Sequence, residues 1–125
     1  MKEYITSTEQ AQCLEVKEIF DTFLQEVGDS CIVDAYPFGF LVMEWFHEEY
    51  GFSSQKIFLN ASDLFDYMLS YWETYQAHKI IRVEEQDNEQ MLSKAIDTIR
   101  YTMQDERNEL IMQYENAAML WDVQN

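Results

Sequence analysis

Residues 36–47 read YPFGFLVMEWFH, and whether they form a strand or a helix determines the fold class. The first four residues of this stretch suit a type I turn, because proline stands second and glycine fourth. Residues 40–46 contain several aromatic side chains and a valine, and they predict a strand whose side chains alternate between two faces. The competing interpretation is a helix over residues 37–50, because the apolar residues also recur at helical spacing and Gly51 could end it. We favour the strand.

Working outward from this stretch, short strands at residues 31–33 and 56–59 complete an antiparallel meander. Helical periodicity predicts helices over residues 8–27, from residue 63 to at least residue 76, and over residues 88–121. We therefore expect one domain, residues 1–125, with an α+β fold. Its parts are an N-terminal helix, a three-stranded antiparallel meander, a central aromatic-rich helix and a long C-terminal helix. The alternative is an all-α helical bundle.

The N-terminal helix has recognisable start and stop signals. Ser7 followed by Gln10 fits a capping box, and Thr6 with Glu9 is an overlapping alternative. Gly28 supplies the stop, since glycine readily adopts the backbone geometry that ends a helix. These signals predict a single helix between them.

The last helix would be unusually long. At 1.5 Å per residue, residues 88–121 would form a helix of about 50 Å, whereas a compact globule of this size is roughly 36 Å across. The helix is therefore either broken near its polar lapse, residues 105–109, or continuous and paired with a second chain. Because the lapse contains no glycine or proline, we favour a homodimer. The residues expected to self-associate are Leu110, Tyr114 and Trp121.

Charge divides the chain into three parts. The formal net charge is −16, from 24 acidic and 8 basic residues, and the acid excess lies in residues 1–50 and 84–125. Direct binding to DNA or RNA needs Lys and Arg to displace counterions from phosphates, and anionic membranes attract the same residues. The composition therefore argues against nucleic acid and membrane surfaces, and it favours a basic protein as the partner.

Cysteine usage and apolar run lengths indicate the compartment. Cys13 and Cys31 are too few and too far apart for a disulfide framework or a thiol metal knuckle, so we expect both in the core. Residues 1–6 lack the apolar core of a signal peptide. The longest apolar run, residues 38–43, is far below the roughly 20 residues of a membrane helix. These features predict a cytoplasmic protein.

One short motif resembles a metal site. Glu44 and His47 have the Glu-x-x-His spacing of carboxylate di-metal centres, in which both side chains share one helix face. In a strand they would point to opposite faces, and the second copy that such centres need is missing. Nucleophile elbows, phosphate-binding loops and calcium loops are missing too. We therefore predict no catalytic residues, no metal site and no cofactor, and an enzyme is the less favoured class.

A row of tyrosines is the most suggestive surface feature. Tyr67, Tyr71 and Tyr75 recur at helical spacing on the predicted helix over residues 63–76. Tyrosine has a broad apolar face and a polar tip, and it is enriched at interfaces that are dry at the centre and wet at the rim. We take this tyrosine row as the candidate partner-binding surface. The alternative is that the rings pack beside the core with their hydroxyls at its edge.

Three hypotheses about function result. The leading one is a non-catalytic acidic protein-binding or regulatory module that acts on a basic partner, such as an inhibitor, an immunity-type protein or a mimic of nucleic-acid charge. The second is a self-associating structural protein in which the long helix makes a homodimer. The third is an enzyme or metal protein whose carboxylates only the fold could group.

Overall fold

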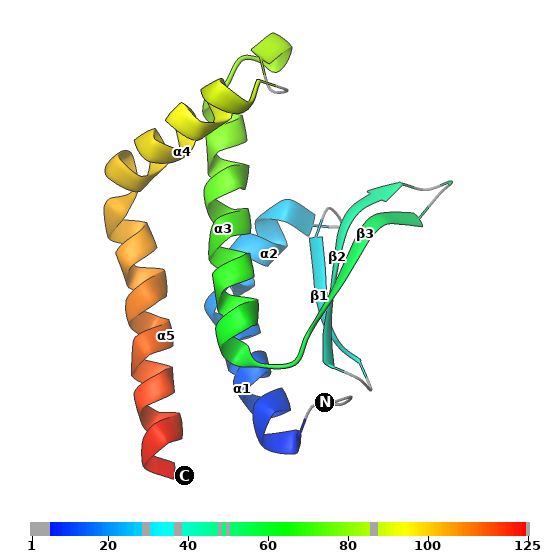
Figure 1. The fold of residues 1–125 in the computed structure, drawn as a ribbon, viewed down its shortest axis with the longest axis vertical. Helices are drawn as coiled ribbons and strands as arrows, with labels where there is room; N and C mark the ends of the chain where they lie inside the picture. Colours follow the sequence, from blue (N-terminus) through cyan, green and yellow to red (C-terminus); the bar gives the residue numbers. More distant parts are fainter. Residues whose placement is uncertain are drawn as a thin grey trace.

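The computed structural model describes residues 6–28, 31–36, 39–47, 49, 51–85 and 88–124, and it shows an α+β fold (Figure 1). The order of elements is the expected one, so the all-α alternative is wrong. The elements are α1 (Ser7–Ile19), α2 (Asp21–Val27), β1 (Cys31–Tyr36), β2 (Gly39–His47), β3 (Gly51–Phe58), α3 (Ala61–Ile80), the short 3₁₀ helix η2 (Val83–Glu85), α4 (Glu89–Thr102) and α5 (Gln104–Gln124).

The sheet is an antiparallel meander with strand order β1-β2-β3. Residues 40–46 lie in β2, so the strand is confirmed and the helix over residues 37–50 is wrong. β3 begins at Gly51, earlier than the expected strand over residues 56–59. The centre of the predicted turn, Pro37 and Phe38, lies outside the described residues.

Gly39 is required where β2 begins. Its φ is +150°, which L side chains rarely adopt, and a Cβ atom there would lie 2.6 Å from the carbonyl oxygen of Phe58. The neighbouring pair Phe40 and Phe58 lies opposite in the register of β2 and β3. The absence of a side chain therefore lets the two strands approach closely at this end of the sheet.

The N-terminal helix is two helices rather than one. The capping box uses Thr6, whose Oγ1 accepts from the N–H of Glu9 at 3.1 Å, while the Glu9 carboxylate accepts from the N–H of Thr6 at 3.2 Å. At Phe20 the backbone leaves helical geometry, with φ −97° and ψ 13°. The ring of Phe20 is fully buried and packs on Phe65, with 5.6 Å between centroids. The bend lets Phe20 enter the core while α2 turns toward β1.

The core lies between α1, α3 and the inner face of the sheet (Figure 1). Cys13 and Cys31 are buried in it as expected. α3 is the central helix, and α5 lies on its other side from the sheet. No helix in the described part of the chain is both long enough and apolar enough to cross a membrane. The largest fully buried side chains include Phe20, Phe40, Leu64 and Met68.

The long C-terminal helix is broken at Met103, where φ is −113° and ψ is 27°. The continuous helix over residues 88–121, on which the favoured dimer depended, is therefore wrong. The alternative, a break near residues 105–109, is confirmed, and it lies two residues before that polar lapse. After it, α5 runs antiparallel to α3 and packs against α1 and α3 (Figure 1). The break contains no glycine or proline. Arg100 before it and Arg107 after it both donate to the buried carboxylate of Glu73 on α3.

Candidate functional site

A groove of about 420 Å³ lies between α1, α2, α3 and the start of α5. Its size is within the roughly 300–1,000 Å³ of ligand pockets. Its floor is mainly apolar, since Phe23 and Trp72 are buried there and Ile19 and Leu110 are partly buried around them. We call it the acidic groove, after the carboxylates at its rim.

The rim acids are Glu26, Asp105, Glu106 and Glu109, and all four are exposed. Asp105 and Glu106 lie in the first turn of α5, where the N–H groups of a helix N-terminus favour negative charge. Glu109 accepts a hydrogen bond from Nε2 of Gln113 at 3.1 Å. Within the described part of the chain, Asp105 and Glu106 form no ion pair. These two carboxylates are therefore available to a cation.

Glu26 is already paired with a lysine. Nζ of Lys79 lies 2.5 Å from Oε1 of Glu26 and 4.8 Å from the ring centroid of Tyr75. The hydrogen bond with Glu26 raises the pKa of Lys79, so the ammonium is charged at neutral pH. Both side chains are nearly half-exposed, so water screens the pair and it contributes about 0–1 kcal/mol to stability. The other three rim acids keep a net negative charge over the groove.

Gln76 is the buried polar residue of the groove. It lines the groove and is 9% exposed. Among the described residues, its side-chain amide has no hydrogen-bond partner. Leaving a buried amide unmatched costs about 1–3 kcal/mol, and buried polar groups in native proteins are normally satisfied. The amide therefore marks the point in the groove where a polar group of a ligand would bind.

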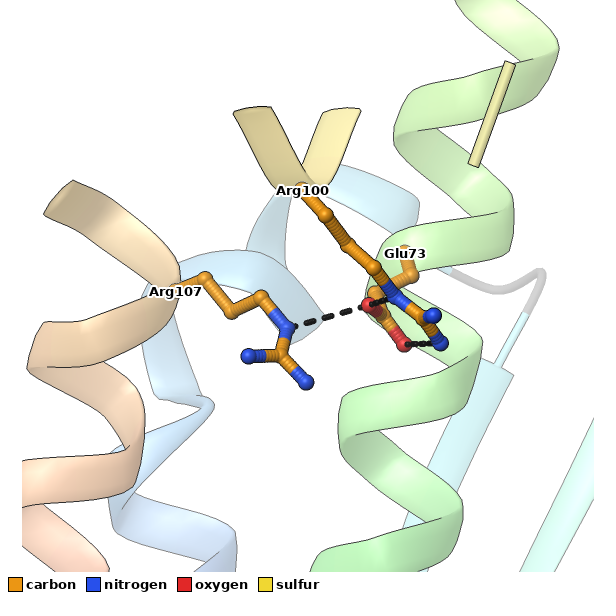
Figure 2. Close-up of polar contacts among 3 residues, drawn as sticks. All are labelled: Glu73, Arg100 and Arg107. Atoms are coloured by element: carbon orange, nitrogen blue, oxygen red, sulfur yellow. Dashed lines mark hydrogen bonds and ion pairs between the residues drawn. The ribbon is translucent and has the colours of Figure 1, made fainter. Parts of the chain in front are cut away.

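A cluster of three charged residues, the Glu73 cluster, joins α3, α4 and α5 (Figure 2). Oε2 of Glu73 accepts from Nε of Arg100 at 2.6 Å and from Nε of Arg107 at 3.0 Å, and Oε1 accepts from Nη2 of Arg100 at 3.4 Å. The Glu73 side chain is only 6% exposed, whereas those of Arg100 and Arg107 are 52% and 28% exposed. The hydrogen bond with Glu73 raises the pKa of the Arg100 guanidinium.

The Glu73 cluster positions the rim rather than forming a second site. Its carboxylate is covered, and both oxygens already accept hydrogen bonds from arginine. Arg107 directly follows Glu106 near the start of α5, so the contact of Arg107 with Glu73 also fixes the start of α5 against α3. The cluster thereby holds Asp105 and Glu106 over the groove.

The tyrosine row lies outside the groove lining. Tyr71 and Tyr75 pack edge-on against Phe23, with centroids 5.7 Å and 5.4 Å apart, and Tyr67 packs on Phe58 at 5.2 Å. All three tyrosines are partly buried against the core. The row thus joins α3 to α2 and β3, and Phe23 connects it to the groove floor. Its part in partner binding stays a prediction.

The residues expected to self-associate face the chain's own core. Tyr114 stacks on Phe65, with centroids 4.2 Å apart and 11° between planes. Nε1 of Trp121 donates to Oε2 of Glu15 at 2.7 Å, and Leu110 lines the acidic groove. The break at the start of α5 therefore lets one chain cover this apolar block partly by itself. Self-association through these residues stays a prediction.

Glu44 and His47 lie in β2, a strand, so they do not share the helix face of a di-metal centre. Among the residues that the structure describes, no group of three or more His, Cys, Asp or Glu is arranged to hold a metal ion. The expectation of a chain without catalytic residues or cofactor stays a prediction.

Sequence reasoning missed the two buried polar residues of α3, although their spacing contains a signal. Gln76 takes the next four-residue step after the buried row Leu64, Met68 and Trp72. Glu73 continues the neighbouring apolar row in the same way. A polar residue that continues an apolar row of a central helix is expected to be buried, and it then needs a partner. No sequence spacing predicts that the rim acids come together, because Glu26 and the acids of α5 lie in distant segments of the chain.

Comparisons of the chain with protein-family models, with curated proteins and with solved structures found no match. No residue role is carried over from another protein.

Proposed function

We propose that this chain is a non-catalytic binding module whose acidic groove takes a basic segment of a partner protein. The observation that carries the proposal is the unmatched amide of Gln76 in an apolar groove rimmed by carboxylates. The apolar floor gains by burying the aliphatic stems of bound side chains, at roughly 25 cal/mol per Å². The rim acids pair with their charged ends, and the net charge of −16 attracts a basic partner from a distance.

The lining of the groove favours binding over chemistry on a substrate. Among the described residues that line it there is no histidine, cysteine or lysine, the usual nucleophiles and proton carriers at neutral pH. The rim acids repel phosphates, which disfavours nucleic acid and anionic lipid. An inhibitor, an immunity-type protein or a mimic of nucleic-acid charge would use such a groove in the same way, by occupying a basic surface of its target.

Neutralising the rim tests the proposal. The groove variant Asp105→Asn/Glu106→Gln/Glu109→Gln is titrated calorimetrically with a synthetic peptide rich in arginine, lysine and leucine. We expect its affinity at low salt to fall by about tenfold, because each partly exposed ion pair contributes about 0.2–1 kcal/mol. A matched control removes the same charge from exposed acids outside the groove. The control is Glu84→Gln/Glu115→Gln/Asp122→Asn.

The control variant should lose less than about twofold in affinity, since distant exposed charges are screened by salt. Equal losses in the two variants would mean that the peptide responds to the overall charge alone, and the groove would be rejected as the binding surface. Circular dichroism of both variants checks that the helices are retained.

Self-association is the second candidate, and the outer face of α5 favours it. Met112, Met119, Leu120 and Val123 are 52%, 66%, 61% and 83% exposed. A second copy bound there would bury these side chains, but it would bring together two chains of charge −16. The homodimer should therefore strengthen with salt, whereas binding of a basic segment should weaken. Light scattering at two salt concentrations tests this, and a monomer mass at high salt rejects the homodimer.

A further inference from the structure

The unmatched amide of Gln76 limits which functional groups a side chain bound in the acidic groove can carry. An amide offers an acceptor oxygen and an N–H₂ donor, whereas the rim acids offer only acceptors. An occupant that satisfies both the amide oxygen and the carboxylates must carry several N–H donors and a positive charge. It must also carry an apolar stem, because Phe23 and Trp72 form much of the floor.

Arginine meets these conditions better than lysine. Its guanidinium is planar, stacks on aromatic rings and presents five N–H donors in fixed directions. One guanidinium can therefore donate to an amide oxygen and to a carboxylate at the same time. The lysine ammonium is a compact and strongly hydrated charge, so entering a partly buried groove costs it more hydration.

We propose that the acidic groove binds a single arginine side chain as the anchor of the basic segment. Oε1 of Gln76 accepts one guanidinium N–H, Asp105 and Glu106 accept the others, and the ring of Trp72 packs on the stem. This inference rests on the proposed function and makes it specific. We assign Asp105 and Glu106 as the acceptors of the guanidinium because neither forms an ion pair in the described part of the chain.

The test uses capped peptides that differ only in the central residue, which is arginine, lysine or citrulline. Citrulline has the shape of arginine without its charge. Binding is followed by nuclear magnetic resonance through the side-chain amide signal of Gln76 and the indole signal of Trp72. We expect the arginine peptide to bind about tenfold more tightly than the other two and to shift both signals.

The Gln76→Leu variant isolates the contribution of the amide. It keeps an apolar floor of similar size, so the arginine and lysine peptides should then bind with affinities within about threefold of each other. Gln90→Leu, at an exposed glutamine of α4, is the matched control and should retain the full preference for arginine.

The possible results separate the two proposals. Equal binding of the arginine and lysine peptides with an unmoved Gln76 signal would overturn the arginine anchor and leave the basic-segment proposal standing. Equal binding of the citrulline peptide would overturn both, as would a lack of binding by either cationic peptide at low salt. A preference for arginine that survives Gln76→Leu would overturn the role of the amide.

Discussion

Gln76 and Glu73 are buried polar residues on the same helix, and the fold treats them differently. Glu73 receives two arginines, so its charge is matched within the chain. Gln76 has no such partner among the described residues, and it faces the groove. This difference separates a residue that stabilises the structure from one that is available to a ligand.

Because Gln76 is unmatched, replacing it should change stability and peptide binding in opposite directions. Gln76→Leu removes an unmatched amide, so we expect the free energy of unfolding to rise by about 1 kcal/mol while peptide binding falls. Urea denaturation measures the change, with Gln90→Leu as the control that should stay within about 0.5 kcal/mol of the original chain. A loss of stability in Gln76→Leu would show that the amide has a partner within the fold.

Removing the two arginines of the Glu73 cluster should lower the free energy of unfolding more than neutralising its carboxylate. Arg100→Ala/Arg107→Ala leaves a buried carboxylate without a counter-charge, which we expect to cost about 3–5 kcal/mol. Glu73→Gln leaves two guanidinium groups that reach water, and it should cost about 1.5–3 kcal/mol. Thermal denaturation of both variants tests this asymmetry. A costlier Glu73→Gln would contradict the burial assigned to the carboxylate.

Among the elements, local signals predicted the order of helices and strands but missed the break at Phe20, and the break of the C-terminal helix was only the less favoured alternative, expected near residues 105–109. The alternation of residues 40–46 and the capping residues were sufficient, because they act within a few positions of the chain. The breaks at Phe20 and Met103 have no glycine or proline. The first accompanies a contact of Phe20 with Phe65, and the second lies between two arginines that bind Glu73; both partners are distant in sequence. Such breaks, like the grouping of the rim acids, need the tertiary structure.

The sheet depends on one glycine more than on the others. Gly39→Ala adds a Cβ atom against the carbonyl oxygen of Phe58, so we expect it to cost about 3 kcal/mol or more. Gly51→Ala is the matched control. Gly51 has φ +74° but nothing within 4 Å of an added Cβ, and the substitution should cost about 1–2 kcal/mol. Equal costs, measured by urea denaturation, would contradict the close approach of β2 and β3.

Across the whole molecule, the fold brings part of the excess of acidic residues together around the acidic groove, where these residues can bind a cation. Glu26 and the acids of α5 come from the two acidic parts of the sequence, and they meet over one apolar groove. Sequence charge alone predicted a basic partner, but it could not choose among surfaces. The tyrosine row does not line the groove, although Tyr71 and Tyr75 pack on Phe23 in its floor.

We claim that the acidic groove is the binding surface, and a map of backbone amide shifts tests this claim. The labelled protein is titrated with the arginine-centred peptide at low and at physiological salt. We predict the largest shifts in α2, between Trp72 and Gln76, and over residues 104–110, with smaller shifts as salt rises. Largest shifts on the outer face of α5, around Met112 and Met119, or shifts independent of salt, would contradict the claim.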